Sequence, residues 1–120
     1  MAAEERVVAR VRHVPIPASK VRRVIDQVRG QHVDDALETL RFLPHAAARP
    51  VAKLIQSAVA NAEENFGIPR GDLYVARIVA DEGPGVMPGK GWRRNYGARG
   101  RWRPIRKRSS HITVILETGE

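Results

Sequence analysis

Hydrophobic residues recur along most of this chain at two spacings, either every second residue or every third to fourth residue. In residues 6–14 they alternate with arginines, which is the period-two pattern of a half-buried strand. Pro15 and Pro17 end this segment. Residues 73–80, rich in Tyr, Val and Ile, and residues 111–116 have a similar strand composition. The pattern therefore predicts three strands.

Three other segments carry the spacing of amphipathic helices. The first begins near Ala18 and ends at Gly30, a residue suited to the position just after a helix. The second runs from Asp34, a good N-cap, to about Phe42. The third is the clearest, and Pro50 is compatible with its first turn. The apolar positions are Val21, Val24, Ile25 and Val28 in the first helix, Ala36, Leu37 and Leu40 in the second, and Val51, Leu54, Ile55, Ala58, Val59 and Ala62 in the third.

Residues 83–108 lie between the last two predicted strands and show neither spacing. They hold six of the ten glycines and three prolines. If the flanking strands pair, this segment must run out and back as a hairpin, with its turn near residues 96–98 and a reach of roughly 40 Å. At 120 residues we expect a single domain. Its parts would be a globular body (1–82 and 109–120) and an extended basic arm (83–108).

The excess positive charge is concentrated in this arm. No acidic residue lies between Glu82 and Glu117, and the arm holds nine of the 21 basic residues. The rest of the chain has 12 bases against all 13 acids, so a nearly neutral body carries a strongly cationic arm. Seven of the nine are arginine, which binds phosphate bidentately. The nine are Lys90, Arg93, Arg94, Arg99, Arg101, Arg103, Arg106, Lys107 and Arg108.

Aromatic residues are interleaved with these cations. Trp92, Tyr96 and Trp102 are three of the chain's six aromatic residues, and flat aromatic faces stack on unpaired bases. An ordinary solvated segment mixes the signs of its charges, whereas this one has a single sign. The arm therefore favours nucleic acid as the partner over a merely solvated tail.

A second basic group lies nearer the N-terminus. Some of its members share the helix face opposite the first apolar stripe, so binding of nucleic acid and an ordinary exposed face both stay open. The group contains Arg10, Arg12, Lys20, Arg22, Arg23 and Arg29. A helix–turn–helix over residues 18–42 is disfavoured, because its second helix carries three acids and one base and would repel a phosphate-lined groove.

Residue types that catalytic and metal sites need are scarce or badly spaced. The chain has no cysteine, and its four histidines lack metal-ligand spacing. Residues 85–91 resemble a phosphate loop, but with three residues between the glycines rather than four and no Ser or Thr after Lys90. We expect no enzyme activity, no metal and no cofactor.

Membrane and export signals are also missing from the sequence. No uncharged apolar run approaches the ~20 residues of a membrane span, and the first six residues carry acids without an apolar core. We expect a cytoplasmic protein without membrane contact and without self-association. Two other functions use the same arm: a free nucleic-acid chaperone, and a membrane-active cationic protein. The second is disfavoured because the arm lacks an amphipathic helix period.

Four motifs occur in order along the chain: KVRRVIDQVRG (20–30), SAVANAE (57–63), VADEGP (79–84) and RKRSSHITV (106–114). Together they resemble the large-ribosomal-subunit protein family twenty-two, the universal family whose extended hairpin enters the peptide exit tunnel. In that family they correspond to the first helix, the end of the long helix, the entry into the hairpin and the closing block. The closing block is the most specific of the four.

The resemblance implies an α+β fold, with a three-stranded antiparallel sheet packed with three helices and a long protruding basic β-hairpin. It implies a structural constituent of the large ribosomal subunit that binds large-subunit rRNA, supports assembly, helps to line the nascent peptide exit tunnel and takes part in translation. The chain would be ribosome-bound in the cytoplasm. Its partners would be rRNA and neighbouring large-subunit proteins, and contact with the nascent peptide stays open.

With this family in mind, the residues expected to bind rRNA are the nine arm cations together with Trp92, Trp102, Arg10, Arg12, Lys20, Arg22 and Arg23. The expected tunnel-facing tip comprises Arg94, Asn95, Tyr96, Gly97, Ala98 and Arg99. The chain departs from the family pattern in the arm. Trp102 replaces a small residue, Pro104 stands where Arg is common, and residues 85–96 form a longer segment than usual.

Overall fold

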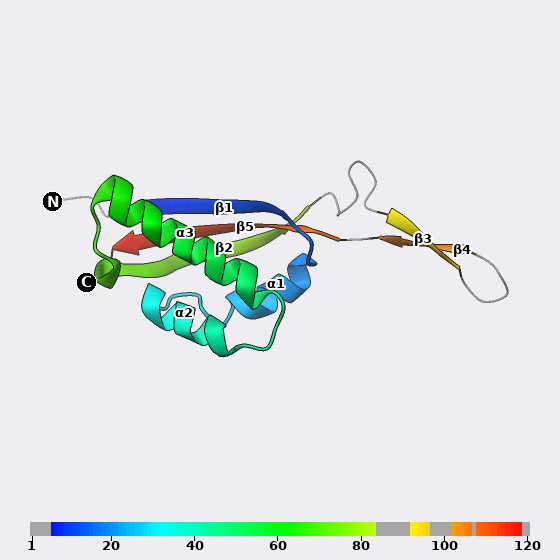
Figure 1. Cartoon of the computed structure of the whole chain (residues 1–120), viewed down its shortest axis with the longest axis horizontal. Coiled ribbons are helices and arrows are strands. Elements are labelled where there is room, and N and C mark those ends of the chain that lie inside the picture. The colour runs from blue at the N-terminus through cyan, green and yellow to red at the C-terminus, as the bar shows by residue number, and fades with distance from the viewer. Residues whose placement is uncertain (1–5, 84–91, 97–101, 107, 119–120) are drawn as a thin grey trace.

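The computed structural model describes residues 6–83, 92–96, 102–106 and 108–118 (Figure 1). Within them the order of elements is β1 (Arg6–Val14), α1 (Ala18–Ile25), α2 (Val33–Phe42), α3 (Ala48–Phe66), a 3-10 helix (Arg70–Asp72), β2 (Leu73–Glu82), β3 (Trp92–Tyr96), β4 (Trp102–Arg106) and β5 (Ser110–Thr118). In this described part, no helix combines the length and apolar character that a membrane span requires.

The body is built on a three-stranded antiparallel sheet in the order β1-β5-β2. The last strand of the chain therefore lies in the centre, and the two earlier strands form the edges. The three helices lie together on one face of the sheet (Figure 1). This arrangement confirms the predicted α+β class with three helices and an antiparallel sheet.

The predicted apolar positions form the core between helices and sheet. Val21, Val24 and Ile25 of α1 are fully buried, as are Ile112 and Leu116 of the central strand. Every stripe position predicted for α3 is also buried. At roughly 25 cal/mol per Å² of apolar surface, this burial is the main favourable contribution to folding.

Helix ends differ from the sequence prediction where other contacts compete. The first helix ends at Ile25 rather than just before Gly30. The N–H groups of Gln27 and Val28 donate to carbonyls three residues back instead of four, and the Gly30 N–H donates to the Val75 carbonyl of β2 at 2.9 Å. Gly30 is left-handed, with φ +82°, as the turn requires. The second helix begins at Val33, and its N-cap is His32, whose Nδ1 accepts the backbone N–H of Asp34, the residue predicted as the cap.

Both ends of the third helix agree with the sequence. Pro50 lies in the first turn, where a missing N–H costs nothing. Gly67 ends the helix in the left-handed conformation at φ +65°.

Beyond the body, β3 and β4 form an antiparallel pair running from Trp92 opposite Arg106 to Tyr96 opposite Trp102. They lie past the end of the body at which β2 stops and β5 starts (Figure 1). The molecule measures 67 × 29 × 20 Å along its principal axes. Tyr96 is the last residue of β3, and Trp102 is the first residue of β4. The turn predicted near residues 96–98 falls mainly on residues that lie outside the described part.

Candidate nucleic-acid interface

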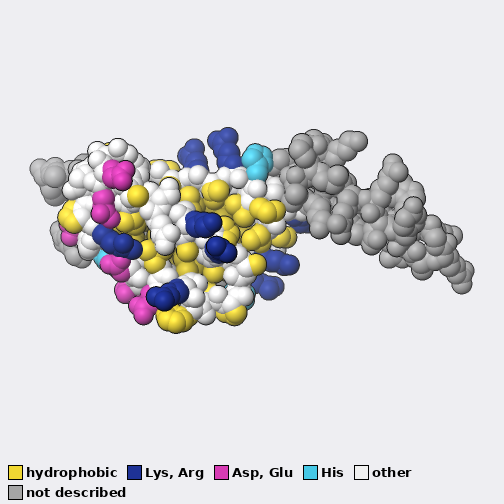
Figure 2. Space-filling model, viewed as in Figure 1, with side chains coloured by type: hydrophobic (Ala, Val, Ile, Leu, Met, Phe, Trp, Pro, Cys, Tyr) yellow, Lys and Arg dark blue, Asp and Glu magenta, His cyan; other side chains and the backbone are white. Residues whose placement is uncertain are grey.

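The charges of the body are divided along its long axis. On the face shown in Figure 2, Asp and Glu side chains gather at the end away from the arm. The elements that meet at this end are the start of α2, the end of α3 and the 3-10 helix (Figure 1). Their acidic residues are Asp34, Asp35, Glu63, Glu64 and Asp72. A body that is nearly neutral in total therefore turns an acidic end away from the cationic arm.

The arm-proximal end collects basic residues from several elements. β1 ends there, α1 begins there, and β5 starts there (Figure 1). The exposed cations on or next to these segments include Arg10, Arg12, Lys20, Arg22, Arg23 and Arg108, and Arg108 lies 3.9 Å from Glu82. The second basic group of the sequence thus lies at the same end of the molecule as the arm.

The open face of the sheet, which lies opposite the helices, carries exposed arginines. Arg10 and Arg12 project from β1 two residues apart, about 7 Å along the strand. In the described residues neither makes an ion pair. Both line a hollow of about 570 Å³ beside the base of the arm, together with Thr113 of β5 and Asp81 of β2. The lining of this hollow therefore carries two guanidinium groups and one carboxylate.

A β-bulge adds Arg77 to the same face. The register of β2 shifts between Val75 and Arg77, so one extra residue stands against β5. Strict alternation from buried Val75 would point Arg77 into the core; after the bulge, Ile78 is buried instead and Arg77 is exposed opposite Ile115. Sequence reasoning missed Arg77, because the bulge is set by pairing between strands rather than by local composition.

His13 and His111 contact each other at the base of the arm. His13 lies within a second irregularity, between Val11 and Val14 of β1, and is the one described non-glycine residue with positive φ, at +60°. Its backbone N–H donates to Nδ1 of His111 at 3.1 Å, and the two rings meet edge to face at 5.0 Å. Gly83 leaves the sheet beside them, and a Cβ there would lie 2.5 Å from Oγ of buried Ser109. A side chain at position 83 would therefore require the Ser109 side chain to shift.

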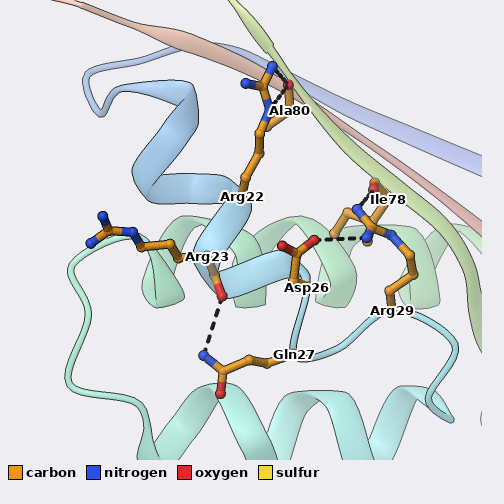
Figure 3. Close-up of polar contacts among 7 residues, drawn as sticks. All are labelled: Arg22, Arg23, Asp26, Gln27, Arg29, Ile78 and Ala80. Atoms are coloured by element: carbon orange, nitrogen blue, oxygen red, sulfur yellow. Dashed lines mark hydrogen bonds and ion pairs between the residues drawn. The ribbon is translucent and has the colours of Figure 1, made fainter.

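Arg22 and Arg29 of the α1 region have partners inside the fold (Figure 3). Nε and Nη2 of Arg22 donate to the Ala80 carbonyl at 3.2 and 2.9 Å. Nη2 of Arg29 donates to the Ile78 carbonyl at 3.0 Å, while its Nη1 pairs with Asp26 at 2.8 Å. Both arginines therefore occupy carbonyl groups along the free edge of β2, which protects that edge from pairing with another strand.

Lys20 and Arg23 differ from Arg22 in this respect. Arg23 points away from β2 in Figure 3. Among the described residues, neither side chain has an ion pair or a hydrogen bond, and both are exposed. Of the three basic residues predicted on the first helix, these two keep their donors free for a partner.

On the arm, the described backbone gives the register of β3 and β4. Trp92 stands opposite Arg106, and Tyr96 stands opposite Trp102. Residues predicted to bind rRNA therefore occur on both of the paired strands.

The remaining predicted site residues of the arm lie outside the described part of the chain. They are Lys90, Gly97, Ala98, Arg99, Arg101 and Lys107. Across the described part, no group of three or more His, Asp or Glu side chains is placed to hold a metal ion.

Comparison with protein-family models supports the resemblance drawn from the four motifs. The family described as Ribosomal protein L22p/L17e matches residues 9–117, from the first strand to the end of the last. The match includes the arm as well as the body. This chain therefore belongs to the L22 family of ribosomal proteins, as a non-enzymatic, rRNA-binding structural constituent of the large subunit that takes part in translation.

Proposed function

We propose that the arm reaches inward through large-subunit rRNA and helps to line the nascent peptide exit tunnel, while the body remains outside on the RNA. The observation that carries this proposal is the antiparallel β3–β4 pair in a segment free of acids. Two paired strands lie only about 4.8 Å apart, so the arm is far narrower than a sheet covered by helices. A narrow cationic pair suits a passage walled by phosphates.

In this proposal the two parts of the arm differ in role. The cations of β3 and β4 bind phosphates on either side, and Trp92, Tyr96 and Trp102 stack on bases. The tip, residues 94–99, faces the tunnel and the nascent peptide. Lys20 and Arg23, with the open-face arginines, anchor the basic end of the body on rRNA. The protein would thus function on ribosomes in the cytoplasm, beside other large-subunit proteins.

Anchoring by the arm can be tested by replacing Arg99, Arg101 and Arg103 with alanine in the full chain. We expect a folded body but reduced incorporation into large subunits, measured by sucrose-gradient sedimentation. The matched control replaces the same three residues with lysine, which keeps the charge but loses the bidentate fork. Incorporation of the alanine variant at the wild-type level would sink the anchoring role.

Lining of the tunnel needs a separate test. A photo-reactive residue at Ala98, in the proposed tip, should cross-link to the nascent chain in stalled ribosomes. The same residue at Ala60, exposed on α3 of the body, should not. If a subunit with normal incorporation gives no nascent-chain cross-link from Ala98, the tunnel role is wrong even though anchoring by rRNA stands.

A further inference from the structure

The helix side of the body holds a groove between α2 and α3, away from the arm and from the open face of the sheet. It encloses about 650 Å³. Leu37, Leu43 and Ala52 line it and are partly buried against the core. Phe42, the last residue of α2, also lines it, and this residue is 74% exposed. The groove therefore presents an accessible aromatic ring beside partly buried aliphatic side chains.

The charge around this groove is positive. Arg41 and Arg49 line it and are exposed, and neither has an ion pair in the described part of the chain. Arg70 also lines it but is paired with Asp34. Glu38 is the one acidic residue among the lining residues. Two free guanidinium groups beside an exposed ring call for a partner that is anionic and has a flat apolar surface.

A second exposed phenylalanine, Phe66, allows a comparison with Phe42. Phe66, at the other end of the helical layer, is 52% exposed. Glu63 and Glu64 precede it by three and two residues on α3. Among the described residues, two phenylalanine rings are thus exposed, and the groove that Phe42 lines is also lined by Arg41 and Arg49.

We propose that Phe42 stacks on an unpaired base of large-subunit rRNA while Arg41 and Arg49 bind the flanking phosphates. An unpaired nucleotide offers a flat base together with a negative charge, and aromatic–base stacking beside arginine is a common mode of single-strand recognition. An apolar protein segment would satisfy Phe42 but leave two guanidinium groups without counter-charges. The inference rests on the rRNA-binding function yet concerns a site separate from the arm.

Ultraviolet cross-linking of assembled large subunits tests the contact directly. Trypsin cuts after Arg41, Lys53 and Arg70 but not between Arg49 and Pro50. Phe42 and Phe66 therefore fall on separate peptides, residues 42–53 and 54–70. After digestion with nuclease and trypsin, mass spectrometry should find a nucleotide on Phe42 and none on Phe66. Because subunits are used, the result does not depend on whether the tip of the arm faces the tunnel.

Substitution gives the quantitative test, with full-length large-subunit rRNA as the probe. Phe42→Leu keeps an apolar side chain but removes the aromatic face, and it should weaken binding by at least about fivefold. Phe66→Leu should leave affinity within about twofold. Both variants should unfold at the wild-type urea concentration, since both rings are exposed.

The arginines provide an independent readout. Arg41→Gln with Arg49→Gln should reduce the slope of log affinity against log salt by about 1.4–1.8, the value for two lost phosphate contacts. Equal rRNA affinity of Phe42→Leu and wild type, or cross-links from the 42–53 peptide to protein instead of nucleotide, would overturn the proposal and assign the groove to a neighbouring protein.

Discussion

The guanidinium group of Arg22 donates two hydrogen bonds to one carbonyl of β2, although the side chain lies at the surface. We predict that Arg22→Ala lowers the free energy of unfolding by about 1 kcal/mol, below the range for buried charged hydrogen bonds because solvent competes here. Arg23→Ala is the matched control and should stay within about 0.5 kcal/mol of wild type. Urea denaturation of the full chain measures both, and equal stability of the two variants would contradict the assignment.

The same pair of residues shows what the sequence can resolve at this scale. Helical spacing predicts correctly that Lys20, Arg22 and Arg23 avoid the apolar stripe of α1. It does not tell which of them reaches a carbonyl of β2, because Ala80 is 58 residues away along the chain. The N-cap of α2 is similar: His32 takes a position predicted for Asp34, and its Nε2 is also held by the Gly71 carbonyl at 2.7 Å.

At the scale of elements, alternation and helical spacing predict all three body strands and all three helices, since each element buries one face against a common core. Which residues of β2 face the core is harder to predict. Its composition predicts a strand, but strict alternation fails at Arg77, and the bulge that corrects it depends on the register with β5. Pairing partners distant in sequence therefore decide which basic residues reach the open face.

The bulge in β2 predicts opposite effects for two single-residue deletions. Removing Ala76, the extra residue of the bulge, leaves Arg77 opposite Ile115 and Ile78 facing the core, so the protein should remain folded. Removing Val79 shifts every later residue by one position and turns Asp81 toward the core, which should cost more than about 3 kcal/mol or abolish folding.

Circular dichroism melts of the two deletion variants distinguish these outcomes. Both remove one apolar residue from the same strand, so loss of length alone affects them equally. If deletion of Ala76 unfolds the body as completely as deletion of Val79 does, the extra residue is not a tolerated insertion. In that case the explanation for the exposure of Arg77 fails.

For the whole molecule, the net charge alone does not show how acidic and basic residues are distributed over the body. The sequence gives a body with one more acid than base, from which no direction of approach to RNA follows. The fold then brings acids from α2, α3 and the 3-10 helix to one end. It brings bases from β1 and α1, with Arg108 just before β5, to the other end, where Asp81 and Glu82 of β2 also lie. These segments are separated along the chain, so the division becomes visible only once they are packed.

If this division sets the orientation on rRNA, equal changes of charge at the two ends should have unequal effects. Lys20→Gln with Arg23→Gln removes two positive charges at the arm-proximal end. It should weaken binding to large-subunit rRNA and reduce the log–log salt slope by about 1.4–1.8. Glu63→Gln with Glu64→Gln removes two negative charges at the far end, and should leave affinity within about twofold and the slope unchanged. At 0.1 M salt the Debye length is about 10 Å, so charges at the far end are largely screened from RNA bound at the other.

Filter binding over a range of salt concentrations measures all three proteins. A gain in affinity for the glutamine pair at 63 and 64 as large as the loss for the pair at 20 and 23 would mean that net charge, and not its position, governs binding.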